Sequence, residues 1–287
     1  MRNIKRRFFK VKNIPVIIIN LLLIALLVVV LYPFIIAFTG SFKTNVEILT
    51  SAELLPKQWN FDNYITAWTK SNFARYTWNS VWYTVCHVVV TVLTTACNGY
   101  VFARGEFRGK KLIFAVFTST MFVALGTSSL YPTLQIMNKL GLSDSLWGLV
   151  VRDFFMLNVA NMFLVRSFIN QLPKQLDEAA TIDGCSFIGI FFRIILPLLK
   201  PMIATLAVLS FSVGWNDYLW PMIVTMGNPD AQPLSVGLQA LKTSGEGAAQ
   251  WNVILAGSMI SAIPMTIVYI IFNKYFVKGI AAGAVKG

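Results

Sequence analysis

The sequence contains few charged residues, few cysteines and one histidine, and these shortages exclude several classes of protein. Charged residues make up 13% of the 287, against about 25% in an ordinary soluble domain. Three cysteines do not support a disulfide scaffold, and no Cys/His cluster has zinc spacing, so we expect no metal site. With a single histidine, no Ser/His/Asp set is credible, so we assign no catalytic residues.

A phosphate-binding glycine loop is also missing. The chain has no G-x-x-x-x-G-K-[ST] segment, so we expect it not to bind nucleotide phosphates by itself. Its net charge of +12 would suit a nucleic-acid partner. However, the Lys and Arg residues lie in short clusters between long apolar runs. That distribution is typical of a multi-pass membrane protein, and we expect no nucleic-acid partner.

Long apolar runs are what the sequence has in abundance, since 56% of its residues are hydrophobic. An α-helix needs roughly 20 apolar residues to cross a bilayer. A β-barrel would need shorter stretches of alternating polarity, and these runs do not alternate. We therefore predict an all-α protein in which residues 1–287 form one transmembrane domain. The six predicted spans are about 14–38, 79–103, 112–137, 146–168, 201–225 and 252–277.

The position of the basic residues predicts how the spans are oriented. A basic segment precedes the first span, as in a signal peptide, but the apolar run is longer than the ~7–15 residues of such a segment and no A-x-A site follows. We therefore expect an uncleaved first helix. Most Lys and Arg residues fall on one side if both termini are cytoplasmic. This predicts a protein of the cell membrane with loops 39–78 and 226–251 outside.

Ionisable residues inside predicted spans are costly in lipid and suggest a function. His87, alone of its kind, is interpreted as a packed residue or a helix-to-helix hydrogen bonder rather than a ligand. Arg152 and Asp153 are adjacent and would point about 100° apart on a helix, so each is expected to have a partner elsewhere. Asp217 has two interpretations, a carboxylate that locks helices together or part of the wall of a polar pathway.

The cytoplasmic segment 169–200 is predicted to be a helix–turn–helix. Pro173 suits a first helical turn, Gly184 suits a left-handed helix end, and Ser186 suits the N-cap of a second helix. Ala179 and Ala180 give the first helix a face of small side chains. We expect that face to let the surface of another protein approach closely.

The spacing in this segment resembles that of a known family. Glu178-Ala179-Ala180, three residues, Gly184, nine residues and then Ile194-x-Leu196-Pro197 match E-A-A-x3-G-x9-I-x-L-P. This resembles the permease subunits of ATP-binding-cassette (ABC) importers. Residues 215–221 (WNDYLWP), 233–238 (PLSVGL) and 275–287 are similar to one branch of it, the carbohydrate-uptake permeases. The whole chain resembles the shorter, six-span permease of the maltose type, with a type I importer fold.

The resemblance implies a function and a set of partners. The chain would provide part of an alternating-access pathway for a sugar or oligosaccharide. Its partners would be membrane lipid, a second permease chain, two ATPase subunits that bind ATP and Mg²⁺, and an extracytoplasmic solute-binding protein. Residues expected to couple to the ATPase are Glu178, Ala179, Ala180, Asp183, Gly184, Leu196 and Pro197. Candidate pathway residues are Asn158, Asn161, Asn216 and Asp217, and candidate binding-protein contacts are Asn228, Gln232, Ser244 and Gly245.

Three alternatives remain at this point. An ABC importer permease for a non-sugar solute is the nearest, although residues 215–221 and the C-terminal segment favour a sugar. An ion-coupled secondary transporter would need charged residues near the middle of the bilayer, whereas the charges here cluster near span ends. A structural membrane scaffold would not need a docking helix with an alanine face.

Overall fold

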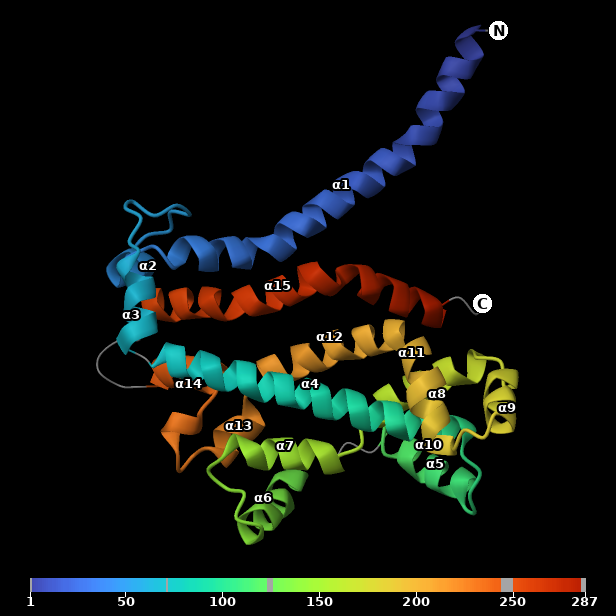
Figure 1. The fold of residues 1–287 in the computed structure, drawn as a ribbon. Helices are drawn as coiled ribbons and strands as arrows, with labels where there is room; N and C mark the ends of the chain where they lie inside the picture. The colour runs from blue at the N-terminus through green and yellow to red at the C-terminus, as the bar shows by residue number, and fades with distance from the viewer. Residues whose placement is uncertain (1, 71, 123–125, 244–249, 285–287) are drawn as a thin grey trace. The chain divides into compact units, whose positions relative to one another are not determined.

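The computed structural model describes residues 2–70, 72–122, 126–243 and 250–284, which form helices joined by short turns and contain no strand (Figure 1). The all-α prediction is therefore confirmed. The chain divides into two compact units. One unit consists of residues 1–71 and 241–260, and the other of residues 72–240 and 261–287.

The first unit contains one very long helix and a short folded segment. Its helices are α1 (Arg2–Gly40), α2 (Asn45–Thr50), α3 (Asp62–Lys70) and the beginning of α15 (Trp251–Ala284). The apolar part of α1, Val16–Gly40, has no buried residues in its most hydrophobic stretch, as expected of a helix that meets lipid or another membrane chain. This part coincides with the first predicted span.

The folded segment after α1 is organised around two buried side chains. Asn63 donates hydrogen bonds from Nδ2 to the carbonyl oxygens of Ser41 (2.8 Å) and Lys43 (2.9 Å). Phe42 packs against the rings of Trp59 and Tyr64 at centroid distances of 5.0 and 5.2 Å. Because buried backbone groups need partners, Asn63 fixes the turn after α1, and loop 39–70 is an ordered structure rather than a loose connection.

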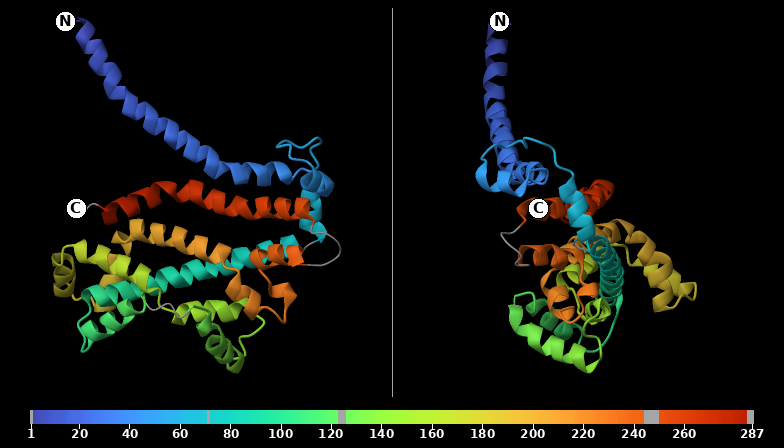
Figure 2. Two further views of the ribbon diagram at one scale, coloured as in Figure 1. Left: turned by 180° about the vertical axis from the view of Figure 1, so that it is seen from behind. Right: turned by 90° about the vertical axis from the view of Figure 1, so that its left-hand side faces the viewer.

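The second unit is built around α4 (Phe73–Arg104), which packs against α7, α8 and α12. Figures 1 and 2 show α12 running along α4, with α7 against another side of it. The other elements of the unit are α5 (Lys110–Ser119), η1 (Gly126–Ser129), α6 (Leu130–Lys139), α7 (Leu146–Phe155), α8 (Val159–Gln171), α9 (Gln175–Ile182), α10 (Phe187–Ile190), a π-turn η2 (Phe191–Ile195), α11 (Leu196–Leu198), α12 (Lys200–Asn216), α13 (Leu219–Val224), η3 (Pro229–Ala231) and α14 (Leu234–Thr243), which runs into the first unit.

Three of the six predicted spans coincide with long apolar helices, α1, α4 and α15. The fourth is a bent pair, α7 and α8, with an angle of 46° between its two helices. The fifth was predicted to continue to residue 225, but α12 ends at Asn216 and α13 begins at Leu219. Asn and Asp favour helix ends because their side chains compete for backbone hydrogen bonds, and Asn216 and Asp217 occupy this break.

The third predicted span, 112–137, does not form one continuous helix. Helix α5 ends at Ser119, and η1 begins at Gly126, ahead of α6. The sequence of η1 is Gly-Thr-Ser-Ser, whose residues are poor helix formers. The expectation of an unbroken helix is therefore wrong, and a crossing of the membrane by this segment stays a prediction.

Candidate functional site

The segment between α8 and α12 has the predicted helix–turn–helix form. Helix α9 ends at Ile182, and Gly184 follows with φ of +78°, in the left-handed region. The N–H of Cys185 bonds to the Ala180 carbonyl (2.9 Å) and that of Gly184 to the Thr181 carbonyl (3.0 Å). These two bonds form a Schellman motif. The prediction for Gly184 is confirmed.

The second helix of the segment also begins where predicted. Ser186 caps α10 by accepting a hydrogen bond at Oγ from the N–H of Gly189 (3.1 Å). The helical path continues through η2 and α11, which holds Pro197 in its first turn, and then bends by 79° into α12. Pro173 is a small correction, because α9 begins at Gln175 and the proline lies just outside the first turn.

An ion pair that the sequence analysis missed attaches α9 to the end of α4. Nε of Arg104, the last residue of α4, lies 2.7 Å from Oδ2 of Asp177 in α9. Nη2 of Arg104 donates to the Leu172 carbonyl at 2.8 Å. Both side chains are largely buried. A basic residue at the end of a predicted span is the one signal that could have suggested the pair.

The two neighbouring alanines of the motif face opposite surroundings. Ala180 is 5% exposed and belongs to the unit's own core, with Tyr100 and Ile190 among its neighbours. Ala179 is exposed. The expectation that Ala180 faces a partner is therefore wrong, because the fold packs this side of α9 against the unit's own core.

The remaining coupling candidates divide in the same way. Leu196 is half-buried against the core that contains Ala180. Exposed members of the set are Glu178, Asp183, Gly184 and Pro197. Between them on α9 lies Ile182, which is 86% exposed and which the sequence analysis did not select. An apolar side chain this exposed at the tip of a helix suggests contact with another molecule.

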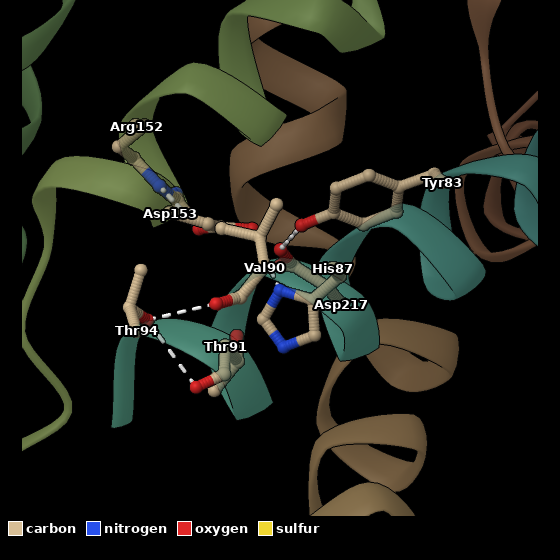
Figure 3. A network of polar contacts seen from close by, with 8 residues as sticks. All are labelled: Tyr83, His87, Val90, Thr91, Thr94, Arg152, Asp153 and Asp217. Carbon is tan, nitrogen blue, oxygen red and sulfur yellow. Dashed lines mark hydrogen bonds and ion pairs between the residues drawn. The ribbon is translucent and has the colours of Figure 1, made fainter. Parts of the chain in front are cut away.

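A buried polar network lies near the middle of α4 (Figure 3). Nδ1 of His87 is 2.6 Å from Oδ2 of Asp153, and Nη2 of Arg152 is 2.8 Å from Oδ1 of the same carboxylate. The hydroxyl of Tyr83 donates to Oδ2 of Asp217 at 3.0 Å. The interpretation of His87 as a helix-to-helix hydrogen bonder is confirmed, and Asp217 links helices as one of its two interpretations proposed.

Arg152 and Asp153 were expected to find partners elsewhere, and that expectation is only half right. They pair with each other because the long Arg152 side chain bends back to its neighbour. Each also has a second partner, since Asp153 contacts His87 and the Arg152 guanidinium lies 4.4 Å from the ring centre of Trp220. The network therefore joins α4, α7 and α13.

A cavity of about 540 Å³ lies beside this network. His87, Asp153, Asn158 and Asn161 are among the residues that line it. Ser210 of α12 also lines it, and this side chain is 2% exposed with no hydrogen-bond partner for Oγ among the described residues.

The four candidate pathway residues therefore fall into two pairs, of which one lines the cavity and the other does not. Asn158 and Asn161 line the cavity, and the Oδ1 of Asn158 also caps α8 by accepting from the N–H of Asn161 (3.0 Å). Asn216 and Asp217 are not among its lining residues. Asn216 donates to the Ser212 carbonyl at 2.8 Å. Both residues contact other parts of the unit, and their position in the wall of a pathway stays a prediction.

The candidate binding-protein loop is fastened at its base. Nδ2 of Asn228 donates to the Asp144 carbonyl (3.2 Å), and the Gln232 carbonyl accepts from Asn79 (2.9 Å). Arg75 forms an ion pair of 3.1 Å with Asp230. Contact of Asn228 and Gln232 with a binding protein stays a prediction. Ser244 and Gly245 lie outside the described residues.

Residues 6–282 match the model of a protein family described as the binding-protein-dependent transport system inner membrane component. A relative from Halalkalibacterium halodurans, the arabinooligosaccharides transport system permease protein AraQ, is 33% identical over 264 residues, which cover 90% of this chain and 92% of AraQ.

Solved structures agree with this match. A chain of a bacterial ABC transporter involved in the import of the acidic polysaccharide alginate superposes with a TM-score of 0.80 and 25% identity, covering 92% of this chain and 98% of that one. A chain of a bacterial alginate ABC transporter, crystallised with an alginate pentasaccharide-bound periplasmic protein, has a TM-score of 0.66 and 14% identity over 95% of both chains, and this likeness concerns the fold alone.

Proposed function

The chain belongs to the binding-protein-dependent transport system inner membrane component family, and we propose that it forms one side of the path by which an ABC importer takes up a sugar or oligosaccharide. Members of this family are membrane permeases and not enzymes. The carbohydrate substrate is supported by the arabinooligosaccharide permease and the alginate importer that the chain resembles. An importer of a non-sugar solute is the second candidate, since the fold alone does not select the solute.

The proposed assembly has the partners that the sequence pattern suggests. This chain and a second, different permease would enclose the path, and a solute-binding protein would deliver the sugar from outside. Two ATPase subunits would bind ATP and Mg²⁺, because this chain has no phosphate-binding loop. The apolar surface of α1 would contact lipid or the second permease.

Helix α9 is the proposed docking element for an ATPase subunit. Its exposed residues Glu178, Ala179, Ile182 and Asp183 would enter a groove on the ATPase, with Ile182 as the apolar anchor. The Schellman motif at Gly184 gives this knob a fixed shape. Burial of Ala180 and the ion pair of Asp177 hold it against the rest of the unit.

The observation that carries the proposal is that α4 joins the docking element to the cavity. Arg104 at its end binds Asp177 of α9, and His87 and Thr91 of the same helix line the cavity. A helix is stiff over this length, so a displacement of α9 by the ATPase would move one wall of the cavity. Coupling of this kind needs a contiguous element that both sites act on.

The cavity is the proposed place where sugar passes. Asn158 and Asn161 offer side-chain amides of the kind that sugar hydroxyls bind. A volume of about 540 Å³ falls in the range of ordinary ligand pockets, roughly 300–1,000 Å³.

Substitution of Ile182 tests the docking element. Ile182→Asp places a charge where an apolar anchor is proposed, and it should reduce copurification of the ATPase and sugar uptake together by about tenfold or more. Leu140→Asp is the matched control, because Leu140 is also an exposed apolar residue at a helix end, 63% exposed. Normal uptake and full ATPase binding in the Ile182 variant would overturn the role of α9.

The proposed topology has both termini in the cytoplasm and loop 39–70 outside, on the distribution of basic residues. A Thr50→Cys substitution in a chain without its three natural cysteines should react with an impermeant thiol reagent in intact cells. Labelling only after the membranes are broken would refute this orientation.

A further inference from the structure

A second pocket, unrelated to the cavity beside α4, lies within loop 39–70 of the first unit. Its volume is about 710 Å³. One wall is the beginning and face of α2, with Thr44, Glu47 and Thr50, and the opposite wall is the segment that leads to α3. That segment contributes Lys57, Gln58, Trp59, Asn60 and Asp62. We refer to it as the loop pocket.

The walls of the loop pocket are held in place by contacts that include some of its own lining side chains. The N–H of Lys57 donates to Oε1 of Glu47 at 2.9 Å, which joins the two walls. The N–H of Asn60 donates to the Phe42 carbonyl at 2.9 Å. Trp59 packs against the ring of Phe42 with a centroid distance of 5.0 Å and an angle of 61°. Binding to a pocket that is already formed costs little ordering entropy.

The composition of the loop pocket selects a class of ligand. Trp59 is 52% exposed although it is anchored by Phe42, so a face of the indole is open to a ligand. Around it lie carboxylates, side-chain amides, hydroxyls and one ammonium group. A sugar ring has the complementary surface, because its C–H faces are apolar and its hydroxyls both donate and accept hydrogen bonds.

The charged side chains of the loop pocket also indicate what charge its ligand carries. Two carboxylates, Glu47 and Asp62, line the loop pocket against one cation, Lys57. An acidic saccharide or an anionic lipid headgroup would therefore meet unfavourable like charges, whereas carboxylates are strong acceptors for the hydroxyls of an uncharged sugar.

We propose that the loop pocket, formed by Trp59, Glu47, Lys57 and Asp62 on two fixed walls, binds a neutral saccharide. The inference rests on the proposed function, since it gives the permease itself a sugar site that does not depend on the solute-binding protein. Trp59 stacks on the sugar ring, and the carboxylates of Glu47 and Asp62 accept hydrogen bonds from its hydroxyls. Lys57 donates to a ring or hydroxyl oxygen.

Saccharide binding to the purified importer complex in lipid nanodiscs, without the solute-binding protein, tests this site. The probes are maltotriose, cellotriose, arabinotriose and diacetylchitobiose, with an alginate trisaccharide as the acidic comparison, and binding is followed by saturation-transfer NMR. At least one neutral probe should bind, and the acidic one about tenfold more weakly or not at all, as expected for an unfavourable charge contact.

Substitutions in the loop pocket test whether the neutral probe binds there. Trp59→Ala should weaken the bound neutral probe by about tenfold, and Asp62→Asn by about fivefold, which correspond to the loss of one ring contact or one charged acceptor. The matched controls are Trp68→Ala, an exposed tryptophan of α3 that does not line the loop pocket, and Leu49→Ala on α2. Both should bind like the unchanged complex.

Three outcomes would overturn the inference. They are no neutral probe binding, binding that Trp59→Ala leaves unchanged, and a Trp59→Ala variant that loses only its affinity for the solute-binding protein. In the last case the loop pocket docks a protein. Uptake of sugar by the full system is measured in parallel, so that normal uptake with no direct binding refutes the loop pocket alone. Absence of sugar uptake by the unchanged complex would instead refute the sugar permease.

Discussion

The C-terminal end of α4 and its middle hold functional side chains by different means. At the C-terminal end, a compact sequence motif builds α9 and its turn, and one ion pair between Arg104 and Asp177 fastens it. Near the middle, the residues that meet come from three distant parts of the chain, as with Tyr83, Asp153 and Asp217. A local motif shapes the first site, and helix packing alone assembles the second.

The difference teaches which site depends on the fold as a whole. The shape of α9 is set by neighbours in sequence, through the hydrogen bonds of Gly184 and Cys185. The polar network exists only if α4, α7 and α13 pack correctly, because no two helices contribute all of its members. We therefore expect damage to the network to cost more stability than damage to the motif.

The largest effect is expected from Asp153→Ala. This change leaves the Arg152 guanidinium and His87 without their shared carboxylate in a buried site. Breaking a buried ion pair from one side costs about 3–5 kcal/mol. The melting temperature of the purified complex should fall steeply, whereas Asp153→Asn, which keeps an acceptor oxygen, should lose less. Equal melting of the alanine variant and the unchanged protein would show that the network is not structural.

Arg104→Met should have the second-largest effect on the stability of the complex. It removes the ion pair to Asp177 and the hydrogen bond to the Leu172 carbonyl, and it leaves a largely buried carboxylate. We expect a loss of about 3 kcal/mol and ATP hydrolysis that no longer drives uptake. Arg193→Met, at an exposed basic residue of η2, is the control. Tight coupling in the Arg104 variant would contradict the link between α9 and α4.

A comparison of two leucine substitutions separates the inward from the outward face of α9. Ala180→Leu adds volume to the unit's own core and should cost about 1–3 kcal/mol even without an ATPase present. Ala179→Leu enlarges an exposed residue and should leave the melting temperature unchanged while it weakens ATPase binding. If both variants melt normally, the assignment of Ala180 to the core is wrong.

The smallest effect is expected from Tyr83→Phe. It removes the one hydrogen bond to Asp217 and keeps the ring, which should cost about 1 kcal/mol or less. A double-mutant cycle with Asp217→Asn measures the interaction directly. Tyr131→Phe, at a ring that is 70% exposed, is the control. A coupling energy near zero would mean that the contact is present but does not hold the helices.

Ser145, which lies between the third and fourth predicted spans, has a structural role. Its Oγ accepts a hydrogen bond from the N–H of Trp147 and caps α7. Loss of such a cap costs about 1 kcal/mol. Substitutions there are therefore poor controls for the coupling segment, and Leu140 serves better.

By itself, the sequence determined the features that depend on neighbouring residues. The apolar length of α1, α4 and α15, the left-handed turn at Gly184 and the cap at Ser186 follow from local composition and backbone geometry. The family motif follows in the same way, since its fixed positions lie within one short stretch.

Only the tertiary structure decided which side chains meet. The sequence could not show that Arg152 turns back onto Asp153, that Ala180 faces inward and Ile182 outward, or that Asn158 shares a cavity with Ser210 while Asp217 does not. The physical reason is that such contacts depend on the rotation and bending of helices against one another. A break of two or three residues, as at 156–158 or 217–218, reorients every side chain that follows.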